Sequence, residues 1–103
     1  MQEINNEILL HDSYLLFIHT PFCGTCHLTR SMIHQIEKIH QTDIFHEMNA
    51  SLYPQFMLEN QVESVPCLLI KHKEEVVEKI YAFQSIPNVY QYVMKYRPEL
   101  FEK

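Results

Sequence analysis

The fold is decided by two adjoining stretches, Tyr14-Leu15-Leu16-Phe17-Ile18-His19 and Phe22-Cys23-Gly24-Thr25-Cys26-His27. The first is a continuous apolar run too short for a helix, which predicts a strand covered on both faces. From Cys23 to His40 the apolar residues recur at helical spacing, on a face made of Leu28, Met32, Ile33, Ile36 and Ile39. The two cysteines therefore lie between a strand and the start of a long helix.

The pattern C-x-x-C in this position predicts thiol–disulfide exchange. A separation of three residues places both sulfurs on one face of the first helical turn, close enough for a disulfide. Unpaired backbone amides and the positive end of the helix dipole stabilise a thiolate on the first cysteine. We therefore expect Cys23 to be the attacking nucleophile and Cys26, deeper in the helix, to be the resolving thiol.

Further elements are predicted on both sides of this unit. The expected elements are a short helix over 4–10, strands over 44–48, 65–70 and 76–81, a helix over 51–59 capped by Ser51, and a last helix from about Pro87 to Pro98. The strands over 65–70 and 76–81 flank a short polar turn, which predicts an antiparallel pair. This order predicts one α/β domain over residues 1–103, with helices on both faces of a mixed sheet.

The composition excludes several function classes. The chain has 103 residues, 47% of them hydrophobic, and a formal charge of −5 with scattered basic residues, which argues against a nucleic-acid partner. The acidic N-terminus does not resemble a signal peptide, and no apolar run approaches the ~20 residues that span a bilayer. We therefore expect a cytoplasmic protein without a membrane partner. In that reducing compartment three cysteines are catalytic, metal-binding or inert rather than a structural disulfide.

These residues resemble the thioredoxin family from Tyr14 to about Tyr96. The anchors are the aromatic Phe22, the Cys23-Gly24-Thr25-Cys26 site and Val65-Pro66 some forty residues later. The resemblance implies a thioredoxin fold with a central sheet of four to five strands. It also implies a cis proline at Pro66 beside the disulfide. The backbone of Val65 would pair with a substrate peptide as an added strand.

The resemblance also implies the partners and the substrate-contacting residues. The partners would be proteins with disulfides, and a thioredoxin reductase or a low-molecular-weight thiol that recharges the pair, with no cofactor and a monomeric chain. The substrate-binding residues would be Phe22, Gly24, Thr25, Val65 and Pro66. The family motif has tryptophan at Phe22 and proline at Thr25. We therefore expect a reduction potential different from that of the main thioredoxin, within about −270 to −120 mV.

Two further departures concern charge near the resolving cysteine. The family keeps a buried aspartate where this chain has Phe17, and a lysine facing it where this chain has Glu47. No carboxylate occurs between Asp12 and Cys26. Water, or less readily His19 or His27, would then have to move the proton of Cys26. The turn at 73–74 and Ala82 also lack the family's usual glycines, so the chain resembles a minor bacterial thioredoxin-like protein.

The third cysteine, Cys67, leaves alternatives open. It is either a small buried residue, which is the favoured interpretation, or a third redox thiol, or a ligand that joins Cys23 and Cys26 around zinc or an iron–sulfur cluster. No second cysteine or histidine pair has zinc-finger spacing, so redox activity is favoured over a metal site. A different alternative is a binding module with the same fold that docks on one partner.

Overall fold

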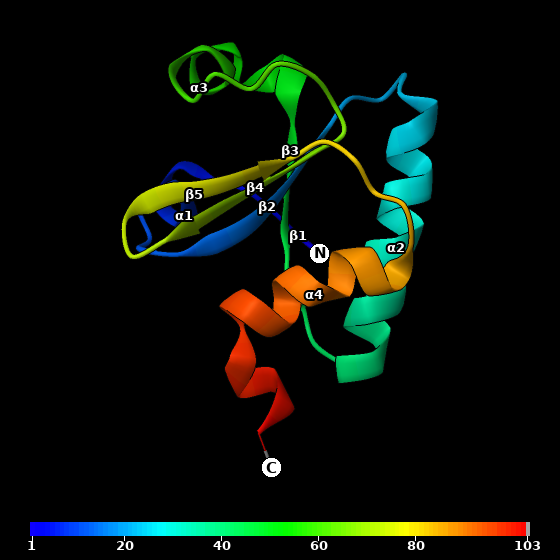
Figure 1. Cartoon of the computed structure of the whole chain (residues 1–103). Coiled ribbons are helices and arrows are strands. Elements are labelled where there is room, and N and C mark those ends of the chain that lie inside the picture. The colour runs from blue at the N-terminus through cyan, green and yellow to red at the C-terminus, as the bar shows by residue number, and fades with distance from the viewer. Residues whose placement is uncertain (103) are drawn as a thin grey trace.

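The computed structural model describes residues 1–102, and its centre is a five-stranded mixed sheet (Figure 1). Across the sheet the strands are β1 (Gln2–Glu3), β3 (His46–Asn49), β2 (Tyr14–His19), β4 (Cys67–His72) and β5 (Glu75–Ile80). β1, β3 and β2 are parallel, whereas β4 is antiparallel to β2 and β5 is antiparallel to β4. The predicted α/β fold, with the strand over 14–19 inside the sheet and a closing hairpin, is confirmed.

Helices cover both faces of the sheet, as predicted. They are α1 (Asn6–Leu9), α2 (Gly24–His40), α3 (Pro54–Glu59) and α4 (Ile86–Tyr96), with 3-10 turns η1 (Ala50–Leu52) and η2 (Pro98–Phe101). α2 and α4 pack on one face, and α1 and α3 pack on the other (Figure 1). Within the described residues, no helix is both long and apolar enough to cross a bilayer.

The structure corrects several predicted boundaries. The strand β1 was not predicted, because two exposed residues carry no period. The helix expected over 4–10 is only α1, which begins after Asn5, whose side chain accepts the Ile8 N–H. The helix expected over 51–59 is divided, because Ser51 lies inside η1 and Pro54 opens α3. The strands predicted over 44–48, 65–70 and 76–81 are shifted along the chain by one or two residues.

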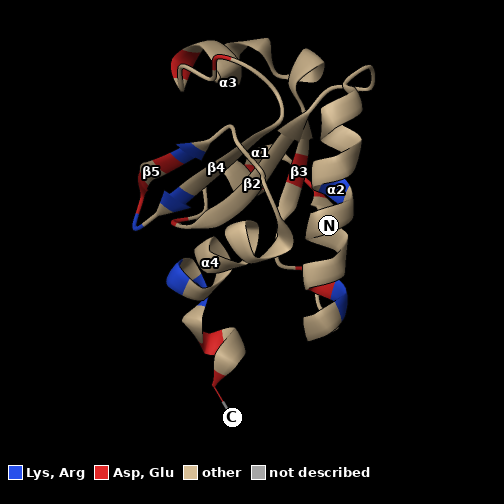
Figure 2. Cartoon of the chain, turned by 45° about the vertical axis from the view of Figure 1, so that its right-hand side comes forward, with Lys and Arg blue, Asp and Glu red and all other residues tan. Residues whose placement is uncertain are grey.

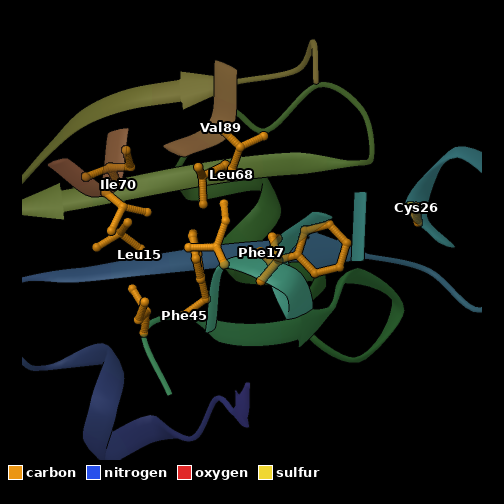
Figure 3. Close-up of a cluster of buried hydrophobic side chains, with 11 residues drawn as sticks. Leu15, Phe17, Cys26, Phe45, Leu68, Ile70 and Val89 are labelled. Carbon is orange, nitrogen blue, oxygen red and sulfur yellow. The ribbon is translucent and has the colours of Figure 1, made fainter. Parts of the chain in front are cut away.

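Strand alternation divides the core into two clusters. Leu15 and Phe17 of β2 face α2 and α4, whereas Tyr14, Leu16 and Ile18 face α1 and α3. Figure 3 shows the first cluster, with Phe17 on the side of the core toward Cys26. This alternation fixes which side chains of each strand lie on the same face of the sheet as α2.

The inner face of α2 differs from the predicted one. Its buried residues are Cys26, Thr29, Ile33, Ile36 and Glu37. Leu28 and Ile39, predicted to face the core, are 65% and 63% exposed. The Glu37 carboxylate explains part of this orientation, because its Oε2 accepts the N–H groups of Ile44 and Phe45 at 2.8 and 3.1 Å. The helix therefore buries the Glu37 carboxylate and leaves Leu28 and Ile39, near its two ends, in solvent.

The hairpin between β4 and β5 turns through two residues with positive φ. Lys73 has φ 52° and Glu74 has φ 69°. Two residues with side chains therefore occupy the left-handed region, which glycine adopts most easily. The Glu74 N–H donates to Asp12 O at 2.8 Å, and the Lys73 N–H donates to Ser13 Oγ at 3.1 Å. These bonds hold the turn against the loop that precedes β2.

We expect Glu74→Gly to stabilise the protein by about 1 kcal/mol, because glycine adopts a positive φ without the steric cost of a side chain. The hydrogen bond to Asp12 is kept, since the backbone supplies it. Glu75→Gly is the matched control. It removes the same charge from the first residue of β5 and should destabilise by about 0.5–1 kcal/mol. Urea unfolding of the oxidised protein measures both, and equal effects of the two substitutions would contradict this account.

Candidate active site

Cys23 and Cys26 form a disulfide at the start of α2. Their Cα atoms are 5.2 Å apart. Cys23 is the N-cap residue, and the Cys26 N–H donates to Cys23 Sγ at 3.2 Å. Cys23 is half-buried, whereas Cys26 is only 3% exposed. The prediction that Cys26 lies deeper than Cys23 is confirmed.

The two residues between the cysteines are exposed. Thr25 Oγ1 lies 3.5 Å from Cys23 Sγ, so the hydroxyl is placed to donate to a sulfur that carries negative charge. The next turn is tied to this one, because Thr29 Oγ1 donates to the Thr25 carbonyl at 3.2 Å. Gly24 has no heavy atom within 4 Å of where a Cβ would lie, so space does not require glycine there. Thr25 therefore gives the site a polar group that proline would not supply.

A groove of about 360 Å³ runs beside the motif, lined by Thr25, Leu28, Thr29, Met32, Val65, Pro66, Tyr81 and Phe83. The Val65–Pro66 peptide is cis, as the family resemblance implied. Pro66 is buried, and Val65 lies outside the sheet ladder because β4 begins at Cys67. The structure thus brings Thr25, Val65 and Pro66 together. Leu28, Met32 and Phe83 join them, although the sequence pattern had assigned the first two to the core.

The surface around the motif is apolar and uncharged. Phe22, directly before the motif, is 99% exposed. Residues 20–29, 64–70 and 82–94 contain no Lys, Arg, Asp or Glu. In Figure 2 the first turns of α2 and the start of α4 are accordingly free of charge colours. A partner docking here meets apolar side chains and hydroxyl groups rather than ions.

A charged cluster lies on the α2 face of the sheet, one turn of α2 beyond Cys26. Arg30 Nη1 is 2.8 Å from Glu47 Oε1, and His19 Nε2 is 3.3 Å from the same oxygen. Phe17 is the register partner of Glu47, and its ring stacks on His19 with centroids 5.4 Å apart. The Arg30 guanidinium lies over the Phe17 ring, with its Cζ 5.4 Å from the ring centroid.

Sequence reasoning had interpreted Phe17 and Glu47 as the loss of a charged pair. That pair is absent, and the structure adds a different one, because Arg30 neutralises the Glu47 carboxylate beside Phe17. Arg30 was missed as part of the site, although its spacing of four residues from Cys26 places both on one face of α2. Burial, together with the Arg30 charge, holds the pKa of His19 below its usual value, against the opposing effect of Glu47.

Cys67 lies on the opposite side of the sheet from Cys26. It is fully buried in the cluster that faces α1 and α3, whereas Cys26 belongs to the cluster that faces α2 and α4. Burial raises the pKa of Cys67 to about 11, although the Tyr81 hydroxyl opposes the shift. The interpretation as a small buried residue is confirmed, and a metal site made by all three cysteines is contradicted. Among residues 1–102, no three His, Cys, Asp or Glu side chains are grouped to hold a metal ion.

The chain is similar to a known protein along most of its length. It is 36% identical over 96 residues to the thioredoxin-like protein YusE of Bacillus subtilis (strain 168), over 90% of this chain and 91% of that protein. No family model matches the chain. At this identity and coverage the chain belongs to the thioredoxin family, as a thioredoxin-like protein with a C-x-x-C disulfide at Cys23 and Cys26.

Solved structures share the fold at low sequence identity. A mutant thioredoxin from Halobacterium salinarum superposes with TM-score 0.74 at 18% identity, over 92% of this chain and 87% of that one. Oxidised thioredoxin from Plasmodium falciparum gives TM-score 0.74 at 11% identity, over 93% and 97%. Oxidised mitochondrial thioredoxin 3 from Saccharomyces cerevisiae gives TM-score 0.68 at 17% identity, over 87% and 83%. These likenesses establish the thioredoxin fold.

We expect Cys67 to be unreactive in the folded protein. With a pKa of about 11, only about one thiol in a thousand is ionised at pH 8, and burial denies access to that fraction. The oxidised native protein should release no thionitrobenzoate from Ellman's reagent over minutes, and one equivalent after denaturation. Cys67→Ala should release none in either state. Fast release from the native oxidised protein that Cys67→Ala abolishes would contradict the burial of this thiol.

Proposed function

We propose that the chain is a thiol–disulfide oxidoreductase that exchanges its Cys23–Cys26 pair with disulfides of protein substrates. The observation that carries this proposal is the position of the Cys23 sulfur. It caps α2, receives the Cys26 amide at 3.2 Å and stays accessible, while Cys26 is buried behind it. A purely structural disulfide needs neither the helix start nor the difference in exposure.

The cycle follows from this geometry. In the reduced protein the Cys23 thiolate attacks a substrate disulfide, forms a mixed disulfide and releases the first substrate thiol. Cys26 then attacks the Cys23 sulfur, closes the intramolecular disulfide and releases the second substrate thiol. A reductase of the thioredoxin reductase type, or a low-molecular-weight thiol, returns the pair to the dithiol in a reducing cytoplasm. The chemistry is carried by the two sulfurs, without a cofactor.

The groove beside the motif supports binding of an extended, apolar substrate segment. Val65 lies at the groove with its backbone outside the sheet ladder, which suits strand addition by a substrate peptide. Phe22 precedes the cysteine pair in the chain and Leu28 follows it, and both are exposed and offer apolar contact area. The absence of charged residues from the nearby segments favours uncharged protein segments over charged small thiols as the substrate class.

The oxidoreductase activity is tested by the reduction of insulin with dithiothreitol. We expect wild-type protein to accelerate insulin precipitation, Cys23→Ser to abolish the acceleration, and Cys26→Ser to lose turnover because the mixed disulfide is not resolved. Cys67→Ala, outside the site, is the control and should match wild type. Absence of any acceleration by the wild-type protein would contradict the proposal.

The groove is tested by Leu28→Lys. A charge in this apolar groove should lower kcat/KM for a disulfide-bonded apolar peptide by about tenfold, or about 1.4 kcal/mol. The rate with a small disulfide such as oxidised dithiothreitol should stay unchanged. Ile39→Lys is a closely matched control, since Ile39 is similarly exposed on the same helix but lies about three turns away from Leu28. Equal effects of the two substitutions would rule out the groove as a docking surface.

A second candidate is a binding module that serves one dedicated partner. The almost fully exposed Phe22 favours it, because a large aromatic ring in solvent is typical of a docking anchor. Trapping with Cys26→Ser separates the two functions, since a general oxidoreductase captures many proteins as mixed disulfides whereas a dedicated module captures one.

A further inference from the structure

The connection between α3 and β4 carries Val65 and is fixed at two points. Near its start, Val62 packs against the buried cluster that faces α1 and α3, and its N–H donates to Met57 O at 3.0 Å. At its end Pro66 is buried, and β4 begins at the next residue. Residues 63–65 lie between these points and belong to no helix or strand. The backbone proposed above to pair with a substrate therefore lies in a short stretch without regular structure.

One side-chain hydroxyl holds this stretch. The Glu63 N–H donates to the Tyr81 hydroxyl, with 3.2 Å between nitrogen and oxygen. Among residues 1–102, the backbone over 63–65 makes no other hydrogen bond. A phenol can also donate, and the same hydroxyl bonds to the Cys67 sulfur, where it opposes the effect of burial on the pKa of that thiol. One phenol group therefore contacts the chain on both sides of the Val65–Pro66 pair.

Lys79 holds the beginning of the same connection. Its Nζ donates to Asn60 O at 2.9 Å and to Gln61 O at 3.3 Å. These two carbonyls directly follow α3, and the carbonyls at the end of a helix have no partner within the helix. Gln61 has φ 53°, so the chain turns through the left-handed region at this point. The ammonium group therefore satisfies the carbonyls where the chain leaves α3.

Lys79 and Tyr81 reach the connection from one face of the sheet. They are two residues apart at the end of β5, so their side chains point the same way. Lys79 is the register partner of Leu69, which belongs to the cluster that faces α1 and α3, and Tyr81 packs against that cluster. Tyr81 also lines the groove beside the cysteine motif, together with Val65 and Pro66. The hydrogen bond from Glu63 thus joins the wall of the groove to the stretch that carries Val65.

We infer that Tyr81, assisted by Lys79, is a positioning residue for substrate binding, an inference that rests on the proposed oxidoreductase function. Its hydroxyl holds the Glu63 N–H and limits the motion of the stretch that carries Val65. The Val65 backbone is then ordered before an extended substrate segment arrives, so less conformational entropy is lost when the segment binds. The effect falls on binding, because both side chains act on the backbone of this connection.

The inference is tested by Tyr81→Phe, which removes the hydroxyl and keeps the ring. For a disulfide-bonded apolar peptide, KM should rise about fivefold, the effect of about one neutral hydrogen bond, while kcat changes less than twofold. Lys79→Met should also raise KM. Tyr53→Phe and Lys71→Met are the matched controls and should keep the wild-type KM. The Tyr53 hydroxyl and the Lys71 ammonium also bond to backbone groups, but neither residue lines the groove.

Backbone ¹⁵N relaxation gives a readout that does not depend on turnover. In the oxidised protein, the order parameters of the Ser64 and Val65 amides should fall in Tyr81→Phe and keep their wild-type values in Tyr53→Phe. Unchanged order parameters in Tyr81→Phe, or a KM within twofold of wild type, would overturn the inference. A wild-type protein that does not turn over the peptide would instead contradict the proposed function, and the relaxation measurement would still decide whether Tyr81 orders this stretch.

Discussion

The Cys26 amide donates a hydrogen bond to the Cys23 sulfur, and the rest of the site is arranged around this contact. It makes the sulfur the cap of α2, so the dipole of a 17-residue helix acts on it. The contact requires a strand that ends just before the motif and a helix that starts inside it. β2 and α2 supply this junction, and their packing buries Cys26 while Cys23 stays accessible. One backbone hydrogen bond thus links the fold to the difference in exposure between the two sulfurs.

Charged and apolar side chains are separated around the cysteine pair. The outer surface has no charged residue in the segments nearest the motif, and it ends in the exposed rings and aliphatic chains of Phe22 and Leu28. The charges lie inward, where Glu47 joins Arg30 and His19 between β2, β3 and α2. Because these charges are partly buried and mutually paired, they leave the outer surface near the motif apolar.

Much of this arrangement was predictable from local patterns. The strand over 14–19, the long helix and the cysteine pair follow from residue spacing, and the cis peptide before Pro66 followed from the family resemblance. The inner face of α2 was predicted less well, because hydrophobicity alone cannot show that Glu37 turns inward to bind two backbone amides.

The cluster at Glu47 was not predictable for a related reason. It depends on the register of β2 against β3, which brings together residues thirty positions apart. β1 also escaped prediction, because a two-residue strand is defined only by its partner.

The reduction potential of the Cys23–Cys26 pair tests the central claim most directly. Equilibration of the protein with defined glutathione or dithiothreitol buffers, followed by quantification of both states, gives this value. The account predicts a two-electron potential between about −270 and −120 mV, the range of C-x-x-C oxidoreductases. A potential below about −300 mV, typical of structural disulfides, would contradict it.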